Sequence, residues 1–371
     1  MERHRPSLGQ KIFINRDYGL LLMGRLVSQI GDGIHYFALT WLVLDLTGSG
    51  AALGTILTVS TLPGILLSPF AGVIVDTLDR KLLIVGADIV RGTLALVLAW
   101  VYFQGGLNMP ILYIATALLS LCAVVFGPAI SASVPNLVTK EQLVEANARQ
   151  SFSMSATGIL GPITGALLLG AAGYGGIFLI NGILFILSGI SEMFIRFPKG
   201  SPSGVSQDTV TGPPSGFAGF LKNFKDGFAY IWTNAGLRAI IIFALILNFL
   251  ANPLFAVVFP FFAKEVLGME ASHFGLIQAA FPIGLMVGSL VIGSLSQKIS
   301  KQRLLAWGII WQGILVLSLS TVAFPNVYPT LPTPALFTII AFPILLMGFF
   351  SVQVNVPLQT VLQEGVPDGY R

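Results

Sequence analysis

Residues 72–81 read Gly-Val-Ile-Val-Asp-Thr-Leu-Asp-Arg-Lys, a short charged stretch between two long apolar runs. A weaker copy, Gly-Ser-Leu-Ser-Gln-Lys-Ile-Ser-Lys-Gln-Arg, occupies residues 293–303. The segments before the two copies also match, because residues 46–54 precede the first copy at the same distance as residues 267–275 precede the second. A repeat at a fixed offset indicates a duplicated architecture. In an apolar chain it predicts two pseudo-symmetric helical bundles.

The composition indicates a membrane protein. The 371 residues are 54% hydrophobic and only 10% charged, and the mean hydropathy is +0.84. A soluble domain carries roughly 25% charged residues, which it needs to cover a surface that faces water. This chain lacks them, so the lipid bilayer is its expected solvent.

Ten apolar segments are long enough to cross about 30 Å of hydrocarbon as helices. They lie at residues 18–44, 50–75, 82–104, 110–134, 146–170, 174–196, 236–263, 273–296, 302–324 and 335–362. The sequence therefore predicts an all-α polytopic protein with a six-helix bundle at 1–197, a cytoplasmic linker at 198–235 and a second bundle at 236–371. Only four spans follow the linker, and we expect the second bundle to lack its last two helices. Aromatic and Lys residues in 217–232 predict an amphipathic helix, on the membrane or on the protein's own cytoplasmic face.

The loop charges predict the orientation. Lys and Arg gather in the leader, in the central linker and in the loops after the second, fourth and eighth spans, while the alternate loops hold almost none, with Lys264 as the exception. Because positive loops stay in the cytoplasm, we expect a multi-pass protein of the cell membrane with a cytoplasmic amino terminus. This distribution also explains the net charge of +4 without a nucleic-acid partner.

Further motifs carry a resemblance to a known family. Residues 15–18 read Asn-Arg-Asp-Tyr, residues 24–32 read Gly-Arg-Leu-Val-Ser-Gln-Ile-Gly-Asp, and the fifth span contains Gly161-Pro162-Ile-Thr-Gly165. Together with the repeated Gly-x3-Asp-x3-Arg-Lys loop, these stretches resemble the major facilitator superfamily, in particular the branch with macrolide efflux proteins and the enterobactin exporter. The Gly-Pro motif is similar to that of the superfamily's proton antiporters. The chain departs from the family at Thr77, at Asp79 and in a fourth span without arginine.

The first span carries the candidate proton or substrate site. Four polar residues share one helix face, with Ser28 and His35 nearby: Arg25, Gln29, Asp32 and Tyr36. Asp32 lies about 21 Å along the helix, where a charge in hydrocarbon costs at least ~2.5 to 3.5 kcal/mol. We expect it to carry a proton or recognise a cation; the alternative is a structural Asp that bonds to a neighbouring helix. Arg25 can pair with an acid, bind a substrate carboxylate or extend to the interface, and His35 is either a proton relay or an interior histidine without such a role.

The loop motif predicts a cytoplasmic gate. Its candidate residues are Gly72, Asp76, Arg80, Lys81, Asp88 and Arg91. Asp88 and Arg91 are three residues apart and can pair with each other or with Asp76, Asp79 and Arg80. Such a cluster either acts as a latch that is made in one state and broken in the other, or is a static surface ion pair. Gly72 is expected at a close helix contact, and Glu192 is expected at the interface.

Two further sets of residues have a packing explanation beside the functional one. Gly161, Pro162 and Gly165 predict a smooth helix that seals or rocks against a neighbour, or simply packs. Uncharged polar residues inside the second-half spans are Asn248, Asn252, Gln278, Asn355 and Gln359. They line a substrate cavity or form hydrogen bonds between helices.

These features favour a secondary transporter that exports a hydrophobic or cationic small molecule, such as a drug, macrolide or siderophore, in exchange for protons. We expect no cofactor, no metal, the proton gradient as the energy source and a monomer. The alternatives are an importer or lysolipid flippase of the same fold, or a non-transporting truncated copy. An enzyme is not expected, because the sequence has no nucleophile with a base and no His-Glu-x-x-His run.

Overall fold

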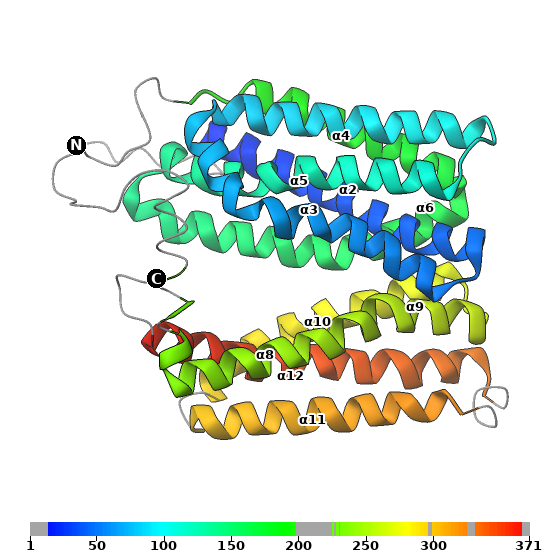
Figure 1. Cartoon of the computed structure of the whole chain (residues 1–371), viewed down its shortest axis with the longest axis vertical. Helices are drawn as coiled ribbons and strands as arrows, with labels where there is room; N and C mark the ends of the chain where they lie inside the picture. Colours follow the sequence, from blue (N-terminus) through cyan, green and yellow to red (C-terminus); the bar gives the residue numbers. More distant parts are fainter. Residues whose placement is uncertain are drawn as a thin grey trace, which may run out of the picture. The chain divides into compact units, whose positions relative to one another are not determined.

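The computed structural model describes residues 14–197, 231–295, 299–324 and 331–365, together with Lys225, Phe228 and Ala229. Four predicted features lie wholly or largely outside this description: the amphipathic helix at 217–232, the side chains of Asp76 and Gln359, and most side chains of the second motif copy. The chain divides into two compact units, residues 1–205 and 206–371 (Figure 1). The division falls inside the segment where the sequence predicts a linker.

All regular structure in the described ranges is helical. The first unit contains α2 (Arg16–Thr47), α3 (Gly50–Thr77), α4 (Arg80–Phe103), α5 (Met109–Leu137), a 3-10 turn η1 (Lys140–Gln142) and α6 (Leu143–Met193). The second contains α8 (Ala235–Pro253), the π-helical segment η2 (Leu254–Val258), α9 (Phe259–Phe261), the π-helical segment η3 (Phe262–Val266), α10 (Ala271–Leu295), α11 (Lys301–Val322) and α12 (Thr333–Gly365).

Short polar residues set where the helices begin. The side chains of Asn15, Asp79 and Asn108 accept backbone N–H groups of the first turns of α2, α4 and α5, at 2.8, 3.1 and 3.1 Å. Such N-caps satisfy donors that have no partner inside the helix. Gly48 ends α2 with φ of 57°, a left-handed conformation that favours glycine. The predicted breaks between the first three spans therefore coincide with capping residues.

The long helix α6 contains the predicted fifth and sixth spans. Its backbone is non-helical at Gly173, where φ is 67°. Before this point Gly161 and then Gly165 approach Gly33 and then Phe37 of α2, so the two segments run in the same direction. After it, residues of α6 meet α2 in the reverse order, with Asn181 beside Gly31 and Glu192 beside Gly24. The chain thus turns back at Gly173, and residues 143–172 and 174–193 are named here the first and second arms of α6.

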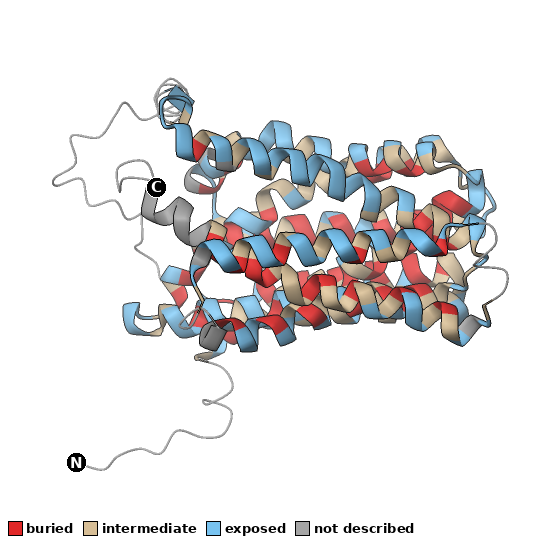
Figure 2. Ribbon diagram, turned by 90° about the horizontal axis from the view of Figure 1, so that it is seen from below, coloured by how far each residue is buried: buried red, intermediate tan, exposed pale blue. Residues whose placement is uncertain are grey.

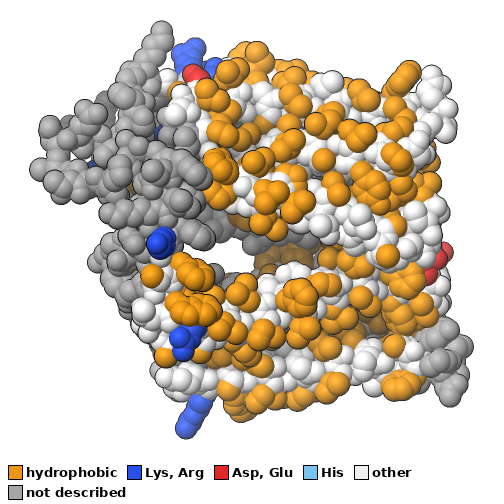
Figure 3. All heavy atoms as spheres, viewed as in Figure 1, with side chains coloured by type: hydrophobic (Ala, Val, Ile, Leu, Met, Phe, Trp, Pro, Cys, Tyr) orange, Lys and Arg blue, Asp and Glu red, His pale blue; other side chains and the backbone are white. Residues whose placement is uncertain are grey.

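Eight helices in the described part of the chain are long and apolar enough to cross a membrane. The number is smaller than the ten predicted spans because both arms of α6 belong to one of these helices and because α2, with Arg25 and Asp32, is not among them. Hydrophobic side chains cover the flanks of the helices in Figure 3, and the Lys and Arg side chains visible on this face lie near helix ends. The chain is therefore a multi-pass membrane protein.

The helix packing repeats between the two units. In the first unit α5 packs against α3 and α4, and in the second unit α12 packs against α10 and α11 in the same way. Buried residues line the helix faces that meet (Figure 2). Gly284 and Gly348 let the backbones of α10 and α12 approach closely, which is typical of membrane helix pairs. This correspondence is what a duplicated architecture predicts.

Candidate functional site

The site is built around α2, which packs more extensively against α6 than against any other element. Small residues make this possible. A Cβ atom on Gly33 would lie 2.9 Å from the Cα of Gly161, and a Cβ on Gly165 would lie 3.0 Å from the Cβ of Phe37. The Gly-Pro motif of the first arm therefore presents two glycines to α2 at close range. Their role in transport stays a prediction.

The second arm of α6 brings polar side chains to the opposite flank of α2. Asn181, Ser188 and Glu192 are seven and four residues apart, a spacing that puts them on one helix face. Asn181 lies against Gly31 and Glu192 against Gly24. All three are almost completely inaccessible, at 1%, 2% and 0% exposed. The α2–α6 interface is thus a tightly packed seam that contains polar groups.

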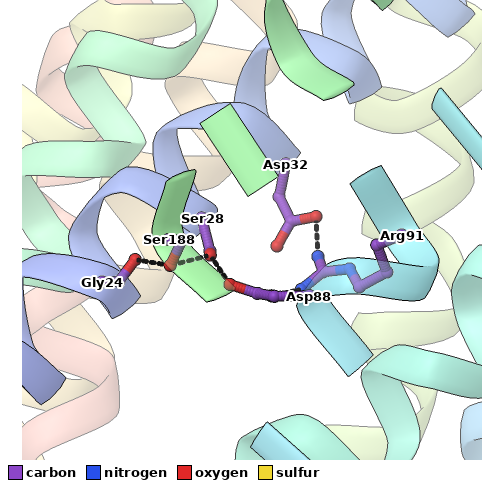
Figure 4. Close-up of polar contacts among 6 residues, drawn as sticks. All are labelled: Gly24, Ser28, Asp32, Asp88, Arg91 and Ser188. Atoms are coloured by element: carbon purple, nitrogen blue, oxygen red, sulfur yellow. Dashed lines mark hydrogen bonds and ion pairs between the residues drawn. The ribbon is translucent and has the colours of Figure 1, made fainter. Parts of the chain in front are cut away.

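A connected polar cluster crosses this interface (Figure 4). Arg91 on α4 donates to the carboxylate of Asp32 on α2, and its other terminal nitrogen lies 3.4 Å from Asp88. Asp88 accepts a hydrogen bond from Ser28. The hydroxyls of Ser28 and Ser188 are 3.0 Å apart, and Ser188 donates to the carbonyl of Gly24 at 2.9 Å. Side chains of α2, α4 and α6 therefore form one network.

Burial is very uneven across the cluster. The Arg91 and Asp88 side chains are 3% and 0% exposed, but the Asp32 side chain is 50% exposed. The guanidinium also lies over the ring of Phe185, 4.2 Å from its centroid, and 5.2 Å from that of Phe126. Cation–π contacts and two carboxylates hold the charge in place. The arrangement therefore presents one accessible carboxylate, Asp32, backed by a fixed and buried cation.

The other candidates on α2 make separate contacts. Arg25 donates to Gln150 of α6 at 2.8 Å, and Gln29 accepts from Ser153 at 3.5 Å. The ring of His35 lies 5.8 Å from that of Phe178, and its buried Nδ1 has no hydrogen-bond partner among the described residues. Tyr36 is 39% exposed. Asp32 is thus the one of these predicted residues that the cluster of Figure 4 includes.

The predicted gate residues do not form one cluster in the described chain. Arg80 donates to the carbonyl of Ala132 at 2.9 Å, and Lys81 donates to the carbonyl of Ile195 at 3.0 Å. Both residues therefore bind the start of α4 to neighbouring segments, α5 and the residues that follow α6. Asp88 and Arg91 pair with each other as predicted. However, both side chains are buried beside Asp32 and do not form a surface ion pair, because α4 turns this face toward α2 and α6.

Two smaller predictions are wrong. Gly72 was expected at a close helix contact, but a Cβ built on it meets no described atom within 4 Å, since this face of α3 is open. Glu192 was expected at the interface but is wholly buried, because the bare backbone of Gly24 lets α2 cover it.

The polar residues of the second unit lie on three different helices. Asn252 and Asn248 bond to each other at 3.2 Å on α8, and both are exposed. Asn355 on α12 is exposed and donates to the carbonyl of Ser351 at 3.0 Å. Gln278 on α10 is half-buried. These contacts stay within single helices, so their assignment to a substrate cavity stays a prediction.

Ser188, Asn181 and Phe185 belong to the site but were not among the sequence candidates. The signal that could have found the two polar residues is the helical spacing of positions 181, 188 and 192 in a largely apolar span. Phe185 lies on the same face as these residues, but nothing in its sequence context distinguishes it from a residue that faces lipid.

Comparison with known proteins agrees with this architecture. A family model described as Major Facilitator Superfamily matches residues 21–371. Macrolide efflux protein A of Streptococcus pyogenes is 26% identical over 291 residues, which cover 78% of this chain and 69% of the relative. Multidrug efflux pump Tap of Mycobacterium tuberculosis is 23% identical over 310 residues, 80% of this chain and 69% of the pump. The crystal structure of a bacterial homologue of the iron transporter ferroportin, inward-facing, shares the fold with a TM-score of 0.65 at 18% identity, over 98% of this chain and 86% of that one.

Proposed function

Because the chain belongs to the Major Facilitator Superfamily, whose matched relatives are transporters and not enzymes, we propose that it exports a hydrophobic or cationic small molecule in exchange for protons. Alternating access between two bundles is the expected mechanism. The protein is expected to act as a monomer in the cell membrane, with its amino terminus in the cytoplasm and the proton gradient as its energy source.

The observation that carries the proposal is the Asp32–Arg91 pair. Asp32 is half exposed, and Arg91 behind it is buried. A proton or a cationic substrate that binds to Asp32 neutralises its charge and releases Arg91 toward Asp88. Protonation and substrate binding then compete for one carboxylate, and this competition is what exchange of a proton for a cation requires. The coupling arises because a cationic substrate binds to ionised Asp32 more tightly than to protonated Asp32.

Two further observations support the direction of transport and the kind of substrate. Two relatives carry efflux in their names, one for macrolides and one for multiple drugs. The glycines of the first α6 arm, which resemble the motif of proton antiporters, pack directly on α2, the helix that carries Asp32. Both observations favour export of a drug-like compound.

The test uses inside-out vesicles that contain the full chain, with an imposed proton gradient and a pH-sensitive dye. Erythromycin, the cationic dye ethidium and a siderophore are added in turn. We expect at least one compound to dissipate the gradient, and Asp32→Asn to abolish this response while the protein remains folded and inserted. A response in the Asp32→Asn vesicles equal to that of the unmodified protein would contradict the role of Asp32.

Asp45→Asn is the matched control. It makes the same chemical change on the same helix, but Asp45 bonds to Tyr174, away from the cluster. This variant should keep the proton response. If no compound changes the gradient with the unmodified protein, while the protein takes up a compound without a gradient, proton exchange is excluded and the transporter is uncoupled.

A further inference from the structure

Glu192 is a buried acid that the proposed mechanism does not use. It lies on the second arm of α6, is 0% exposed, and neither of its carboxyl oxygens has a hydrogen-bond partner among the described residues. A Cβ on Gly24 would lie only 2.7 Å from its Oε1. The side chain is therefore enclosed by the α2 backbone and is not a surface group at a helix end.

The charges around Glu192 do not balance. The charged groups close enough to act on it are Asp88 and Arg91. Ser188 is its polar neighbour on the same helix. Lys81 of α4 donates to the carbonyl of Ile195, beyond the end of α6. The single guanidinium of Arg91 is already shared by Asp32 and Asp88. With Glu192 ionised, three carboxylates would surround one cation and leave a net charge of −2, and the Glu192 carboxylate would be the one without a hydrogen bond among the described residues. An isolated buried carboxylate is so unfavourable that the group takes up a proton instead.

We propose that Glu192 is a second proton-binding group of this transporter, occupied in the conformation in which Arg91 is held by Asp32. The inference rests on the proposed function for its place in transport, but its evidence is the enclosure of Glu192 and the charge imbalance. The ligand is a proton, held on one carboxyl oxygen as the neutral acid.

The cluster supplies a reason for the proton to leave. When a proton or cation neutralises Asp32, Arg91 loses one of its two carboxylates. Its positive charge then acts more strongly on Asp88 and Glu192, and an ionised Glu192 becomes favourable. Asp88 stays ionised beside Arg91, so the proton that Glu192 gives up passes to solvent.

The test is infrared spectroscopy of the purified full chain at neutral pH, without substrate or gradient. Exposed carboxyl groups are ionised under these conditions, so the C=O stretching band of a protonated carboxylic acid reports the buried ones. We expect Glu192→Gln to remove this band or one component of it. Glu141→Gln, which changes an exposed acid on η1, should leave the band unchanged. A band of full intensity in folded Glu192→Gln protein overturns the proposal.

A second variant covers the case in which Glu192→Gln does not fold. Gly24→Ala places a methyl group against Oε1 and should shift the frequency of the band, while Gly86→Ala on α4, where a Cβ meets no described atom within 4 Å, should not. An unshifted band in folded Gly24→Ala protein also overturns the proposal. Because the band is measured without transport, its loss in Glu192→Gln supports proton binding even if the vesicle experiment excludes proton exchange.

Discussion

Arg91 on α4 holds Asp32 on α2 across the interior of the first unit, with the arginine side chain 3% exposed and the aspartate 50% exposed. The same guanidinium lies 3.4 Å from Asp88, whose side chain is wholly buried. Two carboxylates of different accessibility therefore share one cation. Any event at the accessible carboxylate changes the electrostatic environment of the buried one.

Arg91→Met should destabilise the protein strongly, because it leaves Asp88 as an unpaired charge inside the bundle. Removing one partner of a buried pair typically costs about 3 to 5 kcal/mol. We expect a large fall in the thermal unfolding midpoint of the purified protein in detergent. Adding Asp88→Asn to Arg91→Met should restore much of it, since the second change removes the buried charge. A double variant as unstable as Arg91→Met alone would show that the loss comes from packing and not from charge.

Gly33→Ala should weaken the α2–α6 interface. The new Cβ would lie 2.9 Å from the backbone of Gly161, which cannot rotate away as a side chain can. Overpacking of this kind costs roughly 1 to 3 kcal/mol. The measurement is the thermal unfolding midpoint, with Gly86→Ala as the control because a Cβ there has open space. An equal midpoint in the two variants would mean that α2 and α6 adjust freely.

Tyr18→Phe tests the packing of the bundle end that carries the basic loops. The hydroxyl of Tyr18 is buried and donates to the carbonyl of Ala146 at 2.8 Å. Its loss leaves that carbonyl without the bond, at about 1 kcal/mol. We expect a small fall in the unfolding midpoint and unchanged transport. Tyr113→Phe on α5 should change neither, and a fall in transport with Tyr18→Phe would place this end of the bundle in the mechanism.

The sequence predicted the helices and the repeat well because both follow from apolar segments, capping residues and loop charge. It also predicted that Asp32 needs a partner or water, because a lone charge deep in a span is unfavourable. It did not identify that partner. Arg91 lies early in its span, and its position in the sequence predicts a place in the cytoplasmic gate. The rotation of α4 about its own axis, which turns Arg91 toward Asp32, depends on contacts with α2 and α6.

Glu192 illustrates the same limit. Its position near the end of a span suggested an interfacial residue, as acids near helix ends usually are. Its burial depends on Gly24, a residue 168 positions earlier whose missing side chain lets α2 cover the carboxyl group. Neither residue alone carries that information.

Arg91→Lys separates the shape of the cation from its charge. Lysine keeps the charge, but its compact ammonium on a flexible stem cannot reproduce a planar group that bonds to Asp32 and Asp88 and lies 4.2 Å from the ring centroid of Phe185. The pair at Asp32 should therefore loosen while the buried charge balance is kept. We expect near-normal stability and about a tenfold loss of gradient-driven transport, which corresponds to roughly 1.4 kcal/mol.

The control for this variant is Arg149→Lys, because Arg149 pairs with Glu145 one turn away on the same helix, where exchange of the cation should matter little. Transport is measured with erythromycin or ethidium in the vesicles that respond to them. Full transport in Arg91→Lys would mean that a positive charge at this position is sufficient, and that the geometry by which Asp32 and Asp88 share one group is not required for coupling.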